Sequence, residues 1–215
     1  MKIAVLGTGM VGRAVAIGLT ALGHDVVVGS RDPADGRARM TEDGDSEVSG
    51  QIPVATYAKA CEDADLVVNA LHGRGAIAGI FSADIADDTV LLDVANPLDL
   101  TGELPTLFVG NDDSLGEEIQ RGFPSLRVVK SLNTMTADAM VDPTVINGGD
   151  FSTFVSGNDD AAKAQVISLL SALGHQDVID LGDITTARGT EALMLAWVRL
   201  MGPMETPYFT WKVAR

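Results

Sequence analysis

Short runs of Val, Ile and Leu alternate along the chain with longer segments in which apolar residues recur at helical spacing. This alternation is typical of strands and helices that wind into a parallel sheet. The apolar runs predict strands at about residues 2–7, 25–29, 52–54, 65–71, 89–94, 126–132, 152–156 and 177–181. The helical period predicts helices at about residues 10–22, 56–62, 74–83, 114–121, 134–140 and 159–173. The predicted fold class is therefore α/β, with a doubly wound, mostly parallel sheet.

The segment after the last predicted strand has a different pattern. In "TTARGTEALMLAWVRLMG", residues 185–202, apolar side chains fall on nearly all faces of a helix. Such a helix needs cover on both sides, so it crosses the core, forms a pocket wall or packs against a second copy of the chain. The aromatic tail at 208–211 would be costly to leave in water. We therefore expect one domain at 1–182 and a small C-terminal helical extension at 183–215, which completes a pocket or a homodimer contact.

A glycine motif follows the first predicted strand. "KIAVLGTGMVG" places Gly7, Gly9 and Gly12 between an apolar strand and an Ala-rich helix, and this context makes the spacing specific for a Rossmann-type dinucleotide site. Gly7 permits a tight turn, Gly9 lets the backbone approach a pyrophosphate, and Gly12 lets helix and strand pack closely. The helix then offers unpaired amides to the phosphates. The predicted cofactor-binding residues of this turn are Gly7, Thr8, Gly9, Met10, Val11 and Gly12.

The end of the second predicted strand indicates which dinucleotide binds. A site for NAD places Asp or Glu about 20 residues after the glycines, where it holds the ribose 2′-hydroxyl. Here that position is Gly29, followed by Ser30 and Arg31, and the nearest carboxylate, Asp32, lies beyond the arginine. A guanidinium pairs with phosphate through two hydrogen bonds, and a serine hydroxyl can add a third. Ser30 and Arg31 therefore predict a site for NADP.

Three further strand ends carry small or amide residues, in "LVVNALHGRG", "LLDVANP" and "VVKSLNTMT". Ligands of open parallel sheets lie beyond these ends, so the residues there can face the nicotinamide half of the cofactor. The predicted cofactor-binding residues are Ala70, Leu71, His72, Ala95, Asn96 and Asn133. The asparagines are equally suited to turns or helix caps. His72 is the one candidate proton donor, although no carboxylate partner is visible near it.

Composition narrows the class of partner. The 215 residues carry a formal net charge of -15, which disfavours nucleic acid and anionic membranes as partners. The acidic stretches 42–47 and 112–118 are expected to be solvated loops. A single cysteine and the absence of a Cys/His cluster predict neither a disulfide nor a metal site. No apolar run reaches the roughly 20 residues of a membrane helix, so we expect a cytoplasmic protein.

The pattern offers no catalytic apparatus for acid-base chemistry. No nucleophile triad, carboxylate pair or metal cluster emerges, and His24 and His175 each follow a Leu-Gly at the end of a predicted helix, where a loop or cap role is expected. Hydride transfer between two planar rings requires proximity, orientation and exclusion of water more than it requires a catalytic side chain. The sequence therefore favours an oxidoreductase.

The combination of "GTGMVG", "LGHDVVVGSRD" and "LGDITTARGTE" resembles the NADP oxidoreductase family typified by F420-dependent NADP reductase. The resemblance covers nearly the whole chain and implies a Rossmann domain with a small C-terminal extension. It implies that Thr8, Ser30 and Arg31 hold the 2′-phosphate side of NADP and that Leu71-His72 border the nicotinamide. It also implies that the deazaflavin ring of F420 stacks over the nicotinamide, near residues 133–134 and the C-terminal helix. A similar domain occurs in six-transmembrane ferric reductases.

The function expected from residues and resemblance together is hydride transfer between NADP(H) and a second planar redox cofactor, with F420 as the first choice. FMN or FAD is the next acceptor, because "HGRG" and Asp32-Pro33 depart from the residues that resembling F420 enzymes carry, which leaves Arg37 or Arg39 as further basic groups. Reduction of an imine or carbonyl in a small metabolite is an alternative that would need His72 as proton donor. A non-catalytic NADP(H) sensor is the alternative outside enzymes.

Overall fold

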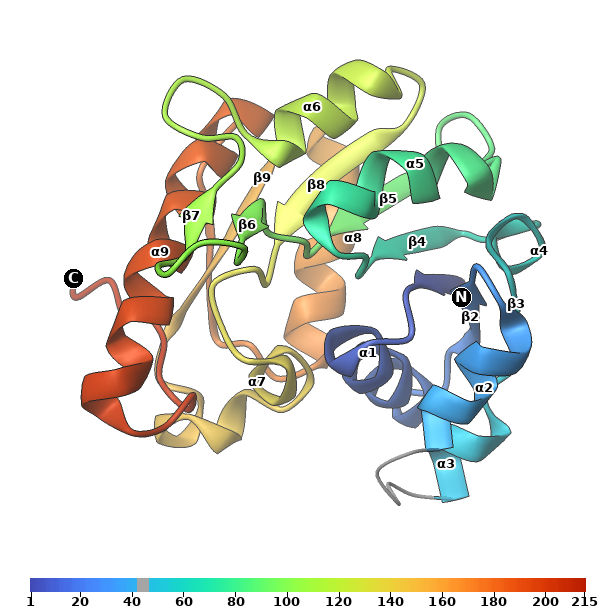
Figure 1. Cartoon of the computed structure of the whole chain (residues 1–215), viewed down its shortest axis with the longest axis horizontal. Coiled ribbons are helices and arrows are strands. Elements are labelled where there is room, and N and C mark those ends of the chain that lie inside the picture. Colours follow the sequence, from blue (N-terminus) through green and yellow to red (C-terminus); the bar gives the residue numbers. More distant parts are fainter. Residues whose placement is uncertain (42–46) are drawn as a thin grey trace.

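A single large sheet organises the protein, for which the computed structural model describes residues 1–41 and 47–215. The sheet has eight strands in the order β10-β9-β8-β5-β4-β1-β2-β3, and helices lie around it (Figure 1). Its strands are β1 (Lys2–Leu6), β2 (Asp25–Ser30), β3 (Val54–Thr56), β4 (Leu66–Asn69), β5 (Val90–Asp93), β8 (Arg127–Ser131), β9 (Ser152–Gly157) and β10 (Asp177–Asp180). These are the eight predicted strands, with shifted ends.

The direction of the strands divides the sheet into two parts. Six neighbouring strands of the sheet run parallel, in the order β3-β2-β1-β4-β5-β8. This is the strand order of a Rossmann fold. β9 pairs antiparallel with β8, and β10 pairs parallel with β9. The predicted Rossmann-type, doubly wound and mostly parallel sheet is therefore confirmed.

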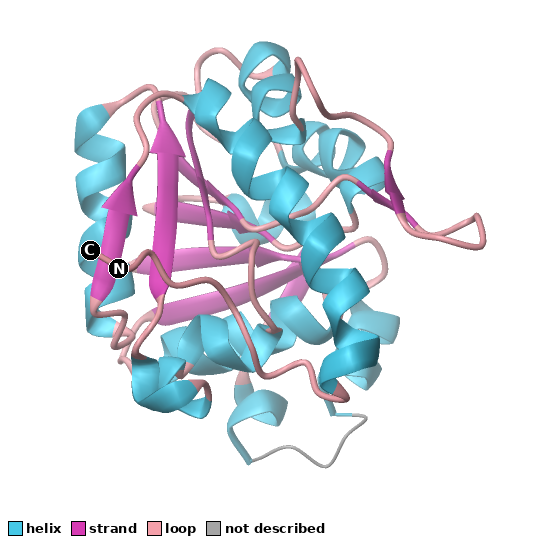
Figure 2. Cartoon of the chain, turned by 90° about the vertical axis from the view of Figure 1, so that its left-hand side faces the viewer, coloured by secondary structure: helices cyan, strands magenta, loops and turns pink. Residues whose placement is uncertain are grey.

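Helices connect the strands and cover the sheet. They are α1 (Met10–Ala21), α2 (Pro33–Thr41), α3 (Glu47–Gln51), α4 (Tyr57–Cys61), α5 (Gly73–Ala83), α6 (Leu115–Gly122), α7 (Ala137–Val141), α8 (Asp160–Ala172) and α9 (Ala187–Met204). Two elements were not predicted from the sequence: the α2–α3 segment and a small antiparallel hairpin, β6 (Leu98–Asp99) and β7 (Thr106–Leu107). The hairpin projects from the body of the molecule (Figure 2).

Strand alternation supplies one hydrophobic core on each face of the sheet. In β1, Ile3 and Val5 join the core shared with α1 and α8, whereas Ala4 and Leu6 join the core shared with α4, α5 and α6. All four side chains are fully buried. Successive side chains of a strand point to opposite faces, so a continuous apolar run is what a strand covered on both sides requires.

The C-terminal helix α9 is buried along one stripe, which includes Ala187, Met194 and Trp197. Its outer side leaves Leu200 and Met201 exposed, so the helix does not cross the core. The tail then folds back, and Phe209 stacks on the Trp197 ring with centroids 5.3 Å apart. One face of the helix thus packs on the body of the protein and lines a cavity, while a subunit contact through the helix stays a prediction.

The two acidic stretches have different outcomes. The stretch 42–47 lies almost wholly outside the described residues. In 112–118, the expected solvated loop is wrong for Glu117, which is buried in the first turn of α6. Its carboxylate accepts hydrogen bonds from Arg188 Nε and Nη2 at 2.8 and 2.6 Å, so the pair fastens α9 to α6. Within the described residues, no helix has the length and apolar character needed to cross a bilayer.

His175 lies in the expected loop, between α8 and β10, but its side chain is buried in the core. Its ring is 5% exposed, with Nδ1 2.8 Å from Thr153 Oγ1 and Nε2 3.0 Å from the Met140 carbonyl. Burial lowers the pKa of His175 below its usual value, although the Met140 carbonyl opposes this shift. The folded protein therefore holds this imidazole neutral at a pH where the unfolded chain protonates it.

We expect this difference to make the fold acid-sensitive. The unfolded histidine takes up a proton near pH 6.5, whereas the folded one does so only at lower pH, so the free energy of unfolding falls as the pH drops from about 7.5 to about 5. Chemical denaturation at several pH values measures this. The His175→Gln variant should show a smaller fall than the wild type. Burial and the N-terminal ammonium also lower the pKa of His24, whose ring is less buried, so His24→Gln should reduce the fall by less than His175→Gln does. An equal fall in all three proteins would contradict the assignment.

Candidate active site

The glycine turn lies at the carboxyl end of β1, where the strand order reverses and a Rossmann fold binds its ligand. Gly7 has φ +118°, and a Cβ there would lie 2.6 Å from the Ala70 carbonyl oxygen. A Cβ on Gly12 would lie 2.1 Å from the Gly7 carbonyl oxygen, whereas a Cβ on Gly9 would have no atom within 4 Å. Gly7 and Gly12 are thus required by the fold, and Gly9 leaves open space over the turn.

The amino-terminal end of α1 faces this space. The helix begins at Met10 with Gly9 as its N-cap, and no side chain caps it. Its first turn also contains no acidic residue. The first amides of a helix have no partner within the helix and carry the positive end of its dipole, so they attract an anion. This end of α1 fits a pyrophosphate.

Just after β2, the carboxylate of Asp32 caps the next helix, α2. Its Oδ1 accepts hydrogen bonds from the backbone N–H groups of Ala34 and Asp35 at 2.9 and 3.2 Å, so it caps α2. Ser30 Oγ donates to the Asp32 carbonyl at 2.8 Å. The residue that comes next after Arg31 is therefore committed to the helix and not to a ribose.

The Arg31 guanidinium is available to a ligand. It is exposed and has no hydrogen-bond or ion-pair partner within the part of the chain that the structure describes. It lies near Tyr57: burial raises the pKa of Tyr57, and the charge of Arg31 opposes that rise. The neighbouring Asp35 pairs with Arg39 at 3.0 Å, which offsets its negative charge. A phosphate beside Arg31 would supply the missing partner of the guanidinium.

Two adjoining cavities lie over the carboxyl ends of the strands. The first, of about 490 Å³, runs from the glycine turn to Ser30 and Arg31. The second, of about 420 Å³, runs from Gly9 toward α9. They share the residues Gly9, Ala70, Leu71 and His72. A third hollow of about 580 Å³ lies beside Arg31 and between α4 and α5. The first two cavities together extend from Arg31 past the glycine turn to the C-terminal helix.

The second cavity is apolar. Its walls come from the start of α1, the turn after β5, the hairpin, α7 and α9, and they include Met10, Val94, Leu98, Leu100, Met135, Met140, Met194, Trp197 and Val198. Among the described residues that line it, His72 is the only one that titrates. Such walls suit a planar ring, because apolar contact and exclusion of water are what they can offer.

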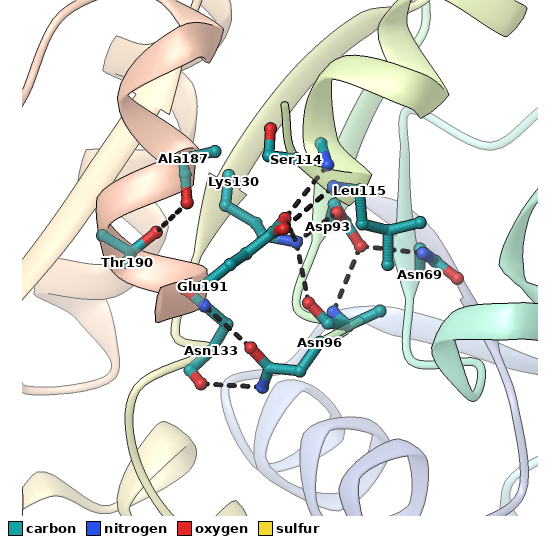
Figure 3. Close-up of polar contacts among 12 residues, drawn as sticks. Asn69, Asp93, Asn96, Ser114, Leu115, Lys130, Asn133, Ala187, Thr190 and Glu191 are labelled. Carbon is teal, nitrogen blue, oxygen red and sulfur yellow. Dashed lines mark hydrogen bonds and ion pairs between the residues drawn. The ribbon is translucent and has the colours of Figure 1, made fainter. Parts of the chain in front are cut away.

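A buried polar network lies beneath the second cavity (Figure 3). The Lys130 ammonium donates hydrogen bonds to Asp93 Oδ2 and to the Ala95 carbonyl, each at 2.7 Å, and forms an ion pair with Glu191 Oε1 at 2.7 Å. The side chains of Lys130 and Asp93 are fully buried, and that of Glu191 is 1% exposed. Burial lowers the pKa of Lys130, but the two carboxylates outweigh it and raise the pKa above its usual value. The lysine is therefore charged.

Each carboxylate has further donors. Asp93 Oδ1 accepts from Asn69 Nδ2 at 2.8 Å and from the Ala95 N–H at 3.1 Å. Glu191 accepts from the first amides of α6, those of Leu115 and Gly116, at 2.8 and 3.0 Å. The positive end of the α6 dipole thereby offsets the negative charge of Glu191. The network joins β4, β5, β8, α6 and α9.

The residues predicted from the sequence fall into two groups. Those that line the two cavities are Gly7, Thr8, Gly9, Met10, Val11, Ser30, Arg31, Ala70, Leu71, His72, Ala95 and Asn96. Gly12 lies buried under the turn, and Asn133 is 1% exposed. Asn133 exchanges hydrogen bonds with Asn96, donating from Nδ2 at 3.0 Å and accepting at its carbonyl at 2.8 Å. Its position supports the neighbouring turn and does not line the cavity.

The sequence analysis missed Asp93, Lys130 and Glu191. A signal for them exists: each is a single charge within an apolar segment, in "LLDV", "VVKS" and "TEALML". A charge that must be buried needs a partner of opposite sign, so three such positions could have been paired. The individual wall residues on α9, such as Met194 and Trp197, were also not singled out.

Comparison with known proteins identifies the family. The sequence profile of the family described as NADP oxidoreductase, coenzyme F420-dependent, matches residues 2–97. A crystal structure from Arthrobacter sp. FB24, named provisionally as an F420-dependent NADP reductase, is 51% identical over 100% of both chains, with a TM-score of 0.92. The chain belongs to the F420-dependent NADP oxidoreductase family. The matched segment of this family contains the glycine turn, Ser30, Arg31 and the turns after β4 and β5.

More distant relatives differ in length. The F420-dependent NADP reductase of Methanothermobacter marburgensis is 29% identical over 205 residues, which are 90% of this chain and 89% of that protein. The metalloreductase STEAP3 of Rattus norvegicus is 26% identical over 210 residues, and the chain spans 38% of its length. A reductive aminase from Aspergillus terreus in complex with NADPH is 17% identical, with a TM-score of 0.64 over 94% of this chain and 63% of that one. That last likeness shows a shared fold.

The two glycines that differ in their surroundings give a test of the turn. In Gly12→Ala the new Cβ meets backbone, so we expect the free energy of unfolding to fall by about 1–3 kcal/mol. In Gly9→Ala the Cβ meets no protein atom and φ is -75°, so stability should stay within about 0.5 kcal/mol of the wild type. The same methyl should weaken NADPH binding about tenfold or more, because it occupies space that the pyrophosphate requires.

Thermal unfolding and titration of NADPH measure the two quantities separately. Normal NADPH binding by Gly9→Ala would contradict the placement of the pyrophosphate, and normal stability of Gly12→Ala would contradict the packing of the turn.

Proposed function

We propose that this protein transfers a hydride between NADP(H), held along the glycine turn, and a second planar cofactor in the apolar cavity, most favourably coenzyme F420. The observation that carries the proposal is the continuity of two cavities of different character. The first has helix amides and a free guanidinium for phosphates, and the second has uncharged, apolar walls. The names of the reductases from Methanothermobacter marburgensis and Methanocaldococcus jannaschii support F420 as the acceptor.

The described residues fit NADP(H). The uncapped start of α1 and the open space over Gly9 suit the pyrophosphate. Arg31 suits the 2′-phosphate, because its guanidinium has no partner among residues 1–41 and 47–215, while Asp32 Oδ1 caps α2. A carboxylate free to face the ribose would repel that phosphate. Backbone amides and one guanidinium thus attract an anionic cofactor to a protein whose net charge is -15.

The second cavity determines what happens at the nicotinamide end. NADPH supplies the hydride, which an oxidised deazaflavin or flavin ring accepts. Ala95 and Asn96 border one side of the cavity, and Met194 and Trp197 border the α9 side. We infer that these walls hold the two rings face to face at about 3 to 3.5 Å and exclude water. His72 is the one titratable group on the cavity wall, and direct transfer between rings needs no proton from it.

The sequence-based expectation of a homodimer stays a prediction. The outer side of α9 exposes Leu200, Met201 and Met204. A second copy would cover such side chains, and the oligomeric state in solution tests this.

Replacing Arg31 tests the choice of cofactor. In Arg31→Ala the 2′-phosphate loses a charged, bidentate partner, so we expect the dissociation constant of NADPH to rise about 10- to 100-fold. The dissociation constant of NADH should change by no more than about twofold, since NADH lacks that phosphate. Fluorescence titration measures both. Arg37→Ala is the matched control, because Arg37 lies on α2 outside both cavities; equal losses for the two nucleotides would remove Arg31 from the phosphate site.

Turnover tests the acceptor. The purified protein is mixed anaerobically with NADPH, and F420 or FMN is offered in parallel, with NADH as control donor and absorbance as readout. We expect rapid oxidation of NADPH with F420 and little with NADH. Turnover with FMN alone would assign the protein to flavin reduction. Tight NADPH binding without turnover of either acceptor would contradict the proposal and favour a small-metabolite reductase or an NADP(H) sensor.

A further inference from the structure

Lys130 connects two parts of the lining of the apolar cavity. Its ammonium group contacts groups from three different segments: it donates hydrogen bonds to Asp93 of β5 and to Ala95 of the turn after it, and it forms an ion pair with Glu191 of α9. Lys130 itself lies on β8. None of these charged groups lines the cavity, so the network acts from behind the walls.

On the strand side, the network holds the peptide groups of Ala95 from both ends. The Ala95 N–H donates to Asp93 Oδ1 at 3.1 Å, and its carbonyl accepts from Lys130 Nζ at 2.7 Å. Ala95 and the next residue, Asn96, line the cavity beside the glycine turn. The position of this wall is therefore set by a charged pair rather than by the loop alone.

On the helix side, Glu191 lies one turn before Met194 on α9, and Met194, Trp197 and Val198 line the same cavity. The Glu191 carboxylate is itself held by the two amides of α6. A shift of α9 relative to the sheet must therefore break an ion pair in a region without water access.

We propose that Lys130 and Glu191 are positioning residues for hydride transfer, which set the separation between the Ala95–Asn96 wall and the α9 wall. This inference rests on the proposed function, because the separation matters if two rings stack between these walls. Neither residue touches the rings. Buried ion pairs add little net stability compared with apolar residues, but they demand one geometry. A displacement of about 1 Å in such a site can slow a reaction about 100-fold.

Two variants of Glu191 test this inference. Glu191→Gln removes one of two carboxylates and leaves Lys130 paired with Asp93, so no buried charge is left unpaired. Glu191→Asp keeps the charge and withdraws the carboxylate by one methylene. It replaces Glu191→Gln in the test if the glutamine variant does not fold. The matched control is Arg188→Gln, which breaks the ion pair between α9 and α6, that of Arg188 with Glu117 at 2.6 Å. Arg188 lies outside the cavity.

The measurements are the single-turnover rate of NADPH oxidation with F420, the KM for F420, the melting temperature, and the dissociation constants of NADPH and 2′,5′-ADP. The last compound probes the adenosine phosphate end alone. For both Glu191 variants we expect the single-turnover rate to fall about 10- to 100-fold and the KM to rise. Binding of 2′,5′-ADP should stay within about twofold of the wild type. Arg188→Gln should keep the wild-type rate.

A lower melting temperature with an unchanged single-turnover rate would overturn the inference, because the network would then be structural only. An equal loss of rate in Arg188→Gln would also overturn it, since any loosening of α9 would suffice. Failure of the proposed function gives a different result: the wild-type protein itself would turn over neither F420 nor FMN. In that case the comparison of NADPH with 2′,5′-ADP still tests the network, because only a displaced nicotinamide wall weakens NADPH selectively.

Discussion

The buried ammonium of Lys130 is the constraint on which the rest of the site depends. A charged side chain on a strand covered on both faces has no water, so the fold must supply its partners. Asp93 and Ala95 come from the neighbouring strand and its turn, and Glu191 comes from a helix far along the chain. The Glu191 carboxylate is also buried and accepts hydrogen bonds from the first amides of α6. Placing one lysine thereby brings five elements together at the carboxyl edge of the sheet.

The same edge contains two chemically different surfaces. Around the glycine turn the chain presents backbone amides and the Arg31 guanidinium, beside the Asp35–Arg39 pair and Asp32, whose Oδ1 caps α2. Around α9 it presents methionines, aliphatic residues and Trp197. The charges that support the second surface are kept behind it, where Lys130 faces two carboxylates and the α6 amides contact the second of them, Glu191. An acidic protein can therefore attract an anionic cofactor at one end and offer a dry, neutral wall at the other.

The sequence was informative where one local pattern decides the structure. The apolar runs predicted the eight strands, and the glycine spacing predicted the turn with its cleft. The α2–α3 segment was missed because "PADGRARMT" has no apolar period, and only Gly36 and Met40 of α2 are buried. The β6–β7 hairpin was missed because two-residue strands leave no pattern. His175 and the Lys130 network depend on contacts between distant segments, which no local pattern contains.

The position of the C-terminal helix follows from the same reasoning. Its apolar residues on nearly all faces left burial, a pocket wall and a subunit contact open, and local propensity could not decide among them. Glu191 fixes the face of the helix that packs on the sheet, because a carboxylate within that helix has to be brought to Lys130 and to the α6 amides, while the subunit contact stays a prediction. Met194 and Trp197 then lie one and two turns further on and face the cavity. A single polar residue thus orients an otherwise ambiguous helix, and the apolar side chains that remain exposed are the ones its register turns away from the sheet.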